Sequence, residues 1–461
     1  MRDLLVMAIV MLSLPLTLRR PFVGLLVFSW LAYMRPQDLC WGFARTLRLS
    51  FFVSIVMLFG WWANEQGKRR FTRWEPRTVM MMVLMVLIAI SYAQAKLQDE
   101  YTNKYFFEYL KIVVVALFTV GQCDSKQRLR AMFWVIAISL GFFGVKSGLW
   151  GLVTGGGSQI LRGPGGMLED NNDFALALVM NIPLLWYMGL SAVDRPWLKK
   201  ATRIAIVLTA ITVLLTHSRG AFLAMTTSAL VIAWRSGKLL RAGGALVVLG
   251  LLFPLLAPQS VLERLGTIGD TKESSTAARL NSWGTAFNMI RDNPVWGVGM
   301  RNFQPRYREY SIVPLPPEAK TYVAHNSYLQ IWAESGTLAF VAYLAILASI
   351  FLTCWRLQRI SRRRPDLWWV GNYARMMEVT TVAFMVGAFF LNRGHFDLIY
   401  HWIVLVTALA ALGLHAAYRQ QEPAAVPARG GRGHRIAVRW RDDAALVGAG
   451  ARAAPQWRRR G

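Results

Sequence analysis

Residues 319–354 read AKTYVAHNSYLQIWAESGTLAFVAYLAILASIFLTC, and they join a polar segment to a long apolar one. From Asn326 to Cys354 the stretch carries a single charged residue, Glu334. A helix of about 20 apolar residues is long enough to cross the hydrocarbon core of a bilayer. The stretch therefore predicts a transmembrane helix that begins directly after a polar loop ending at His325.

The rest of the chain repeats this pattern. Of its 461 residues, 55% are hydrophobic and only 17% are charged, whereas soluble domains carry about 25% charged residues. The apolar runs are continuous, which favours membrane helices over the alternating strands of a β-barrel. The sequence predicts an all-α polytopic membrane protein with candidate spans at residues 3–18, 21–34, 50–64, 78–95, 104–121, 131–153, 173–190, 203–217, 220–235, 239–257, 326–354, 375–391 and 398–418.

Basic residues in the short loops predict the orientation of these spans. They gather in five loops, at residues 68–77, 126–130, 195–203, 235–241 and 356–364. The positive-inside rule assigns these loops to the cytoplasm. The net charge of +27 therefore indicates orientation, and we expect no nucleic-acid partner. The intervening loops then face outward, at residues 96–103, 154–172, 258–325 and 392–397.

The two ends of the chain need separate treatment. Residues 1–34 read either as two short spans, giving thirteen in all, or as one crossing or a re-entrant pair, giving about twelve with both ends inside. Each short run is below the usual span length, so we expect about twelve. We expect a helix bundle at 1–257, an outward loop at 258–325, further helices at 326–418 and a basic, disordered cytoplasmic tail at 419–461 on anionic lipid.

The sequence shows no pattern typical of a metal or cofactor site. Its three cysteines, Cys40, Cys123 and Cys354, are far apart and form no CxxC, which argues against a disulfide framework or a zinc site. The outward loops contain no HExxH, DxD or Walker motif. We therefore expect no metal and no cofactor.

Arg219 lies in the tight turn His217-Ser218-Arg219-Gly220, between two predicted spans. An arginine at the edge of the hydrocarbon snorkels to the interface or has a partner. The next helix starts here, and its N–H groups and dipole add positive potential. An anion site and a membrane anchor are both compatible with this position.

Arg279 lies in a predicted amphipathic helix in which Leu280, Trp283, Phe287 and Ile290 recur at helical spacing. Ser275 or Thr276 can cap its start, and Asp292-Asn293-Pro294 stops it. Arg279 borders the apolar stripe and can point to the bilayer surface. We interpret Arg291, Arg306 and Arg308 as solvated.

His325 lies directly before the span at 326–354. Ser327 and Gln330 have capping-box spacing, which predicts the helix start. A histidine at a helix N-terminus near arginines has a lowered pKa and is able to accept a proton. A purely structural histidine is the alternative. As further substrate-binding candidates we add Arg264, Arg301, Arg162, Asn326 and His395, whereas Asn172 and Asp173 are better explained as helix caps.

Arginines and a neutral histidine on the outer face suggest group transfer from a substrate that is already activated, because ATP is absent there. A lipid-linked sugar pyrophosphate is such a substrate. Arginine forks can hold its phosphates and stabilise the leaving pyrophosphate. His325 can deprotonate an acceptor hydroxyl that attacks the sugar C1, and this single displacement inverts the anomeric centre.

Four blocks of the sequence resemble the O-antigen ligase and O-antigen polymerase superfamily. They are Ser218-Arg219-Gly220, Arg279-Leu280-Asn281-Ser282-Trp283, residues 293–299 (NPVWGVG) and residues 325–336 (HNSYLQIWAESG). The N-terminal part, with residues 33–38 (YMRPQD) and 169–175 (EDNNDFA), is similar to exosortase-associated O-glycosylation ligases.

The resemblance implies a metal-independent, GT-C-like glycosyltransferase in the bacterial inner membrane, with Arg219, Arg279 and His325 at the functional positions on the periplasmic face. It implies an undecaprenyl-pyrophosphate-linked glycan as donor. The leading hypothesis is an O-antigen ligase that uses lipid A–core as acceptor. An O-antigen polymerase, a protein O-glycosylation ligase, a transporter or flippase of an anionic lipid and an assembly scaffold stay as alternatives.

Overall fold

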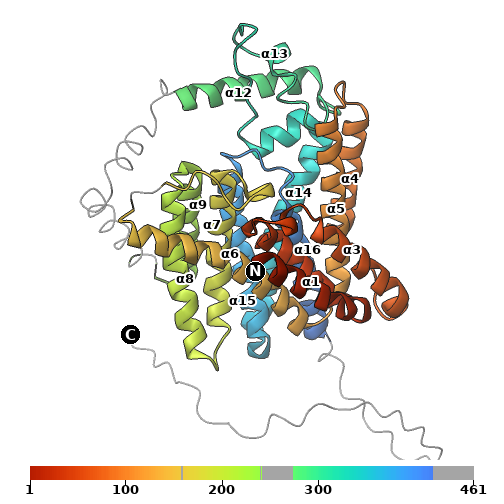
Figure 1. The fold of residues 1–461 in the computed structure, drawn as a ribbon, viewed down its shortest axis with the longest axis vertical. Helices are drawn as coiled ribbons and strands as arrows, with labels where there is room; N and C mark the ends of the chain where they lie inside the picture. Colours follow the sequence, from red (N-terminus) through yellow and green to blue (C-terminus); the bar gives the residue numbers. More distant parts are fainter. Residues whose placement is uncertain (157–158, 239, 241–273, 419–461) are drawn as a thin grey trace, which may run out of the picture. The chain divides into compact units, whose positions relative to one another are not determined.

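The computed structural model describes residues 1–156, 159–238, 240 and 274–418 (Figure 1). Within these ranges the chain is helical, and its only β-structure is an isolated bridge between Arg162 and Asp170. The predicted span at 239–257, Arg264 and the tail at 419–461 lie outside them, apart from residue 240. The longer helices are α1 (Arg2–Arg19), α2 (Pro21–Tyr33), α3 (Leu49–Gly60), α4 (Pro76–Ala93), α5 (Glu100–Gln122), α6 (Lys126–Val153), α7 (Asn171–Leu190), α8 (Pro196–Leu215), α9 (Arg219–Arg235), α12 (Ser274–Asp292), α14 (Ser327–Arg363), α15 (Trp368–Ala388) and α16 (Asp397–Tyr418). Shorter turns of helix are η1 (Pro36–Leu39), η2 (Phe43–Arg45), η3 (Trp61–Glu65), η4 (Gly166–Leu168), α13 (Tyr307–Tyr310) and η5 (Pro365–Leu367).

Local sequence signals explain where several helices begin. Proline occupies the first position of α2, α4 and α8, where its missing N–H would have no partner in the helix. Side-chain oxygens cap the next group, with Asp99 accepting the N–H of Thr102 at 2.7 Å for α5. Asp170 caps α7 by accepting the N–H of Asn172 at 2.8 Å. Each helix start therefore follows from residues that satisfy unpaired backbone donors.

The predicted all-α membrane architecture is confirmed at a coarse level. Each of the twelve predicted spans inside the described ranges forms a helix. Six helices among the described residues are long and apolar enough to cross a membrane, namely α4, α5, α6, α7, α14 and α16. The other six stay predicted spans, because their helices are shorter or more polar.

Residues 1–34 form two helices, α1 and α2, which pack against one another. The carboxylate of Asp3 accepts the N–H groups of Gly42 and Ala44, both at 3.1 Å. The start of α1 therefore lies beside the segment that follows α2. Two helices fit both the two-span interpretation and the re-entrant pair, so the expected number of about twelve spans stays a prediction.

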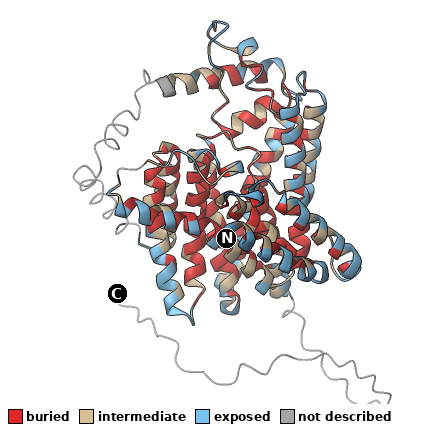
Figure 2. Ribbon diagram, viewed as in Figure 1, coloured by how far each residue is buried: buried red, intermediate tan, exposed pale blue. Residues whose placement is uncertain are grey.

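The centre of the bundle is built from α7, α15 and α16 (Figure 2). In α7, 89% of the most apolar 18-residue stretch is buried by protein, whereas in α4 the figure is 28%. The near-complete burial of α7 means that protein surrounds it on nearly all sides. The exposed side of α4 is the side that a bilayer would cover.

Contacts between loops separate the helix ends into two groups. At one end, Arg69 donates to the Asp124 carboxylate at 2.7 Å, and the Lys126 ammonium lies 5.0 Å from the centre of the Trp369 ring. These pairs join the loops that precede α4, α6 and α15. The basic loops before α4 and α6 and the start of α15 therefore lie at one end of the bundle, as alternating loop charges require.

The opposite end of the helix bundle carries polar loops that the sequence predicts to face outward. Asn302 donates to the carbonyl oxygen of Leu97 at 2.9 Å. Asn171 donates to the carbonyl oxygen of Thr216 at 3.0 Å. In Figure 1, α12 lies crosswise to α4 and α5 beyond this end. The 258–325 loop thus contacts the 96–103 loop, and the 154–172 loop contacts the residues just before the turn at Arg219.

Candidate active site

His325 ends the polar loop one residue before the cap of α14. Its φ is 48°, a left-handed conformation that is uncommon for residues other than glycine. The following residue, Asn326, accepts the N–H groups of Tyr328 at 2.9 Å and Leu329 at 3.0 Å through its side-chain oxygen. This cap turns the chain sharply into the helix and leaves His325 half-buried beside it.

The pKa of His325 is lowered below the ordinary histidine value, first by burial and then by the positive charge of Arg279. Asp170 opposes this change and raises the pKa, whereas Lys320 lowers it further. A histidine with a lowered pKa is neutral at physiological pH and can accept a proton. The sequence-based expectation for the pKa of His325 is therefore confirmed.

Arg279 projects from the first half of α12, and the predicted helix and its stop at Asp292 are confirmed. The predicted apolar stripe is only partly buried, because Leu280 and Phe287 are exposed. The buried face of α12 instead includes Ala286 and Met289, which pack on the rest of the loop. The exposed Leu280 and Phe287 leave an apolar surface on α12, as the predicted helix lying on a membrane surface requires.

Arg219 is the first residue of α9, as predicted. The side chain of Ser218 caps this helix by accepting the N–H of Ala221 at 3.4 Å. A Cβ atom on Gly220 would lie 2.8 Å from the Cβ of Phe390, so the start of α9 packs tightly on the segment after α15. The position combines a guanidinium group with a helix N-terminus, which favours an anion.

Phe389 and Phe390 contact α12 and α9, the two helices that carry Arg279 and Arg219. Trp283, one turn after Arg279, packs edge-on against Phe389 with ring centres 5.4 Å apart. Its neighbour Phe390 packs against Gly220, next to Arg219. Both candidate arginines therefore come from elements that contact the end of α15.

A second cluster surrounds Arg301, which also has a left-handed backbone with φ of 62°. Its guanidinium lies 4.0 Å from the centre of the Tyr105 ring and contacts the hydroxyl of Tyr101. Beside it is a cavity of about 380 Å³. Its lining residues come from five segments and are Tyr101, Arg301, Phe303, Gln304, Pro305, Arg308, Thr321, Val323, Glu334 and Asn392.

His395 belongs to the Arg301 cluster and does not resemble a catalytic base. Burial and the charge of Arg301 lower its pKa to about 3. Its ring packs edge-on against Tyr109 with centres 5.2 Å apart. With so low a pKa the imidazole stays neutral and is too weak a base to take a proton from a hydroxyl at physiological pH.

The loop at 391–397 holds the start of α14 in place. The Ser327 hydroxyl donates to the carbonyl oxygen of Leu391 at 2.7 Å and accepts the N–H of Arg393 at 2.8 Å. The Gln330 side chain accepts the N–H of Gly394 at 3.1 Å. The predicted capping box of Ser327 with Gln330 is therefore wrong. Asn326 caps the helix, and the two residues bind a loop distant in sequence.

The same loop is fixed to α7 by a buried ion pair between Arg393 and Asp173. The structure corrects our interpretation of Asp173 as a helix cap, because Asp170 has that role. Arg393 was missed, although an arginine between two apolar runs was a visible signal. The pair shows that the acidic start of α7 serves to anchor the loop beside His325.

The helix α14 is broken at Gly336, where φ is 81°. Carbonyl groups freed by the break accept two backbone N–H groups, from Val298 to Ala333 at 2.8 Å and from Gly299 to Glu334 at 3.0 Å. Residues 293–299 and 325–336, two of the blocks quoted from the sequence, are therefore hydrogen-bonded to each other. This docking satisfies backbone groups that the break in α14 would otherwise leave unpaired.

Among the remaining described arginines of the loop, Arg306 differs from expectation, whereas Arg308 is exposed as predicted. Arg306 is buried rather than solvated, and it binds both carboxylate oxygens of Glu309, at 2.7 and 2.6 Å. Arg308 donates to the carbonyl oxygens of Pro316 and Ala319. Both arginines therefore stabilise the conformation of the loop. Glu309 compensates the charge of Arg306, and the two carbonyl oxygens bind Arg308. Arg291 is exposed, as expected.

Three further predicted residues have simple placements. Arg162 is exposed and pairs through its backbone with Asp170. Asn326 is buried and caps α14. Arg264 is outside the described residues. Substrate-binding roles for these three stay predictions.

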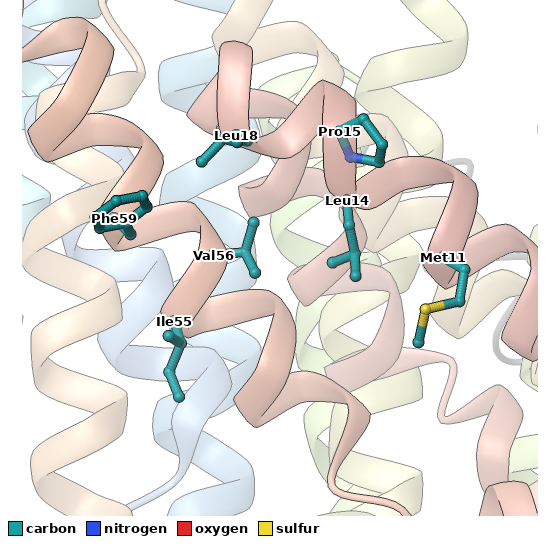
Figure 3. Close-up of a pocket in the computed structure, with 7 residues that line it drawn as sticks. All are labelled: Met11, Leu14, Pro15, Leu18, Ile55, Val56 and Phe59. Carbon is teal, nitrogen blue, oxygen red and sulfur yellow. The ribbon is translucent and has the colours of Figure 1, made fainter.

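Two further features of the described residues concern metal ligands and a second cavity. The described residues contain no group of three or more His, Cys, Asp or Glu side chains that could hold a metal ion. A cavity of about 600 Å³ between α1 and α3 has an apolar lining (Figure 3), made by Met11, Leu14, Pro15, Leu18, Ile55, Val56 and Phe59. It offers no polar group to a substrate.

Comparison with known families adds a decisive observation, because residues 204–344 match the family described as O-antigen ligase. This match supports the O-antigen ligase and polymerase superfamily over residues 204–344. The O-antigen ligase segment begins within α8 and ends within α14, so it contains Arg219, Arg279 and His325. Residues 1–192 match a family of unknown function, and comparison with curated proteins gives no match.

Only part of the site lies in the O-antigen ligase segment. Asp173 belongs to the other matched region, and the loop at 391–397 lies in neither. The superfamily links the chain to O-antigen ligase-type or polymerase-type chemistry in a multi-pass membrane protein. Outside that segment, the loop at 391–397 holds the start of α14 and is itself paired with Asp173.

Proposed function

We propose that this protein is an O-antigen ligase of the bacterial inner membrane. In this proposal its active site faces the periplasm. It transfers O-antigen glycan from undecaprenyl pyrophosphate to lipid A–core, without a metal ion. The observation that carries the proposal is the half-buried His325, whose pKa is lowered by burial and by the charge of Arg279.

The pairing of a neutral base with a guanidinium group suits glycosyl transfer. His325 accepts the proton of an acceptor hydroxyl while the hydroxyl oxygen forms a bond to C1 of the donor sugar. The bond from C1 to the pyrophosphate oxygen breaks in the same step. The lipid pyrophosphate leaves with the electron pair, and C1 is inverted.

Arg279 and Arg219 are assigned to the pyrophosphate. A guanidinium group offers paired N–H donors that match phosphate oxygens, and its charge stabilises the negative charge that develops on the leaving group. The two arginines come from helices that both contact the Phe389–Phe390 pair. One bound pyrophosphate between them would neutralise both charges.

The test is glycan transfer by the purified full-length protein, using lipid-linked O-antigen as donor. Three acceptors are supplied separately, namely lipid A–core, a protein acceptor and a growing glycan. Wild type should use lipid A–core and retain its rate in the presence of chelator. His325→Ala and Arg279→Ala should each lose at least about 100-fold in rate while keeping the wild-type melting temperature.

The outcomes separate the alternatives. Transfer only to a growing glycan or to protein would replace the ligase proposal by a polymerase or a protein glycosylation ligase. Movement of the lipid carrier across liposomes without any acceptor would favour a transporter. A wild-type transfer rate in His325→Ala would disprove its role as base.

A further inference from the structure

The cavity beside Arg301 is a candidate subsite separate from the donor site. At about 380 Å³ it falls in the range of small-molecule sites, about 300–1,000 Å³. Its described lining includes polar groups from α5, α14 and three loops, but not Arg219, Arg279 or His325. The cavity therefore adjoins the proposed catalytic residues without being formed by them.

The cavity also lies close to His325 along the chain. Val323 lines it and precedes His325 by two residues. Two residues of extended chain span at most about 7 Å between Cα atoms. A ligand group in the cavity is therefore within reach of a substrate atom positioned at His325.

The two arginines in the cavity wall already have protein partners. Arg308 donates to the carbonyl oxygens of Pro316 and Ala319. Arg301 stacks on Tyr105 and contacts the hydroxyl of Tyr101. These contacts direct both guanidinium groups toward protein partners, which leaves fewer of their N–H donors for a second phosphate.

The polar atoms of the cavity wall that could bind a ligand, on Asn392 and Glu334, are hydrogen-bond acceptors. The side-chain oxygen of Asn392 is buried and has no hydrogen-bond partner among the described residues. The carboxylate of Glu334 lies in the wall with 2% of the residue exposed, and one of its oxygens accepts the Gln330 amide at 3.3 Å. A buried polar group without a partner is costly, so a ligand with donors would be favoured here.

We infer that this cavity binds sugar hydroxyl groups of the acceptor glycan through Asn392 and Glu334. This inference rests on the proposed transferase function. Hydroxyl groups donate to carboxylate and amide oxygens, whereas a phosphate offers only acceptors and would be repelled by a carboxylate. The subsite holds the acceptor while its attacking hydroxyl extends toward His325, and it makes Asn392 a residue for acceptor specificity.

The experiment uses the full-length protein in lipid nanodiscs, with rough-type lipopolysaccharide as the acceptor probe. The variants are Asn392→Ala and Glu334→Gln. Asn103→Ala is the matched control, because it removes an amide at the same end of the bundle outside the cavity. Two quantities are measured, namely the KM for each substrate and the Kd for the acceptor without donor.

We expect Asn392→Ala and Glu334→Gln each to raise the acceptor KM and Kd by about 10-fold, as for one lost hydrogen bond. The donor KM should stay within about twofold, and Asn103→Ala should match wild type. An unchanged acceptor Kd in both folded variants would overturn the inference, as would an equal effect in Asn103→Ala.

The Kd separates this inference from the proposed function. If wild type binds the acceptor but transfers no glycan, the transferase proposal fails, and the Kd values of the variants still decide whether the cavity holds the sugar. Failure of wild type to bind the rough-type acceptor would overturn the inference directly. Melting temperatures identify any variant that loses binding because it unfolds.

Discussion

Gly336 lies so close to Val295 that a Cβ atom on the glycine would stand 2.0 Å from the Val295 carbonyl oxygen. The glycine has φ of 81°, so its backbone is also in a region that other residues rarely adopt. Both constraints come from docking the 293–299 turn into the break of α14. The relationship explains why a glycine is required at this point in the middle of a membrane helix.

Gly336→Ala should therefore destabilise the protein by at least about 3 kcal/mol, because a clash is added to a strained backbone. Gly67→Ala is the control, since Gly67 has φ of 86° but nothing within 4 Å of a Cβ, and it should cost about 1 kcal/mol. Thermal unfolding in detergent measures both. Equal costs for the two variants would contradict the role of the Val295 contact.

The pH dependence of transfer should report on His325. The neutral imidazole is the active form, so the rate falls as the pH drops through its pKa, and burial and Arg279 place that midpoint below the ordinary value of about 6.5. Lys320→Gln removes a positive charge and should move the midpoint to higher pH. Asp170→Asn removes a negative charge and should move it to lower pH.

The pH experiment measures kcat/KM from pH 4.5 to 8.5 for wild type and both variants. Lys68→Gln, which removes a lysine from a loop at the opposite end of the bundle, serves as control. Shifts of the same sign in Lys320→Gln and Asp170→Asn would argue against His325 as the titrating group.

The ion pair of Arg393 with Asp173 should matter for stability. The side chains are 21% and 7% exposed, and removing one partner of a buried pair leaves an uncompensated charge at a cost of about 3–5 kcal/mol. Arg393→Ala and Asp173→Ala should each lose about that much, and the double variant much less than the sum. Lys96→Ala, which breaks an exposed pair with Glu309, should cost less than about 1 kcal/mol. Additive losses in a double-mutant cycle would refute coupling.

Asn326 offers a test between capping and substrate binding. Serine can also cap a helix, so Asn326→Ser should keep both stability and transfer rate, whereas Asn326→Ala should lose about 1 kcal/mol. Thermal unfolding and initial rates are measured on the same samples. A stable Asn326→Ser protein that has lost activity would show that the amide binds substrate.

The sequence predicted the helices well because apolar run length and loop charge are local signals. The apolar run after Asn326, the helix around Arg279 and the turn at Arg219 all form where expected. The lowered pKa of His325 also followed from local reasoning about charges and a helix start. The helices and the turn depend mainly on residues within one or two turns of the chain, whereas the pKa of His325 is lowered first by burial and then by Arg279, which is distant in sequence.

Long-range pairings could not be predicted in the same way. Ser327 has a spacing that fits a capping box, yet its hydroxyl binds a loop more than sixty residues away. Asp173 has the position of a cap, yet it pairs with Arg393. Arg306 looked solvated until Glu309 and the fold enclosed it. For Ser327 and Asp173 a distant partner decided the outcome, whereas for Arg306 the partner is local and the burial of the loop decided it.

The loop at 391–397 has a consequence for biosynthesis. All three proposed catalytic residues are translated before residue 326, yet Ser327, Gln330 and Asp173 find their partners only in this late segment. A chain that stops before residue 391 would contain every proposed catalytic group and lack the contacts that hold the start of α14, directly after His325. The site can therefore mature only when synthesis nears its end, which would keep incomplete chains from acting on lipid-linked glycan.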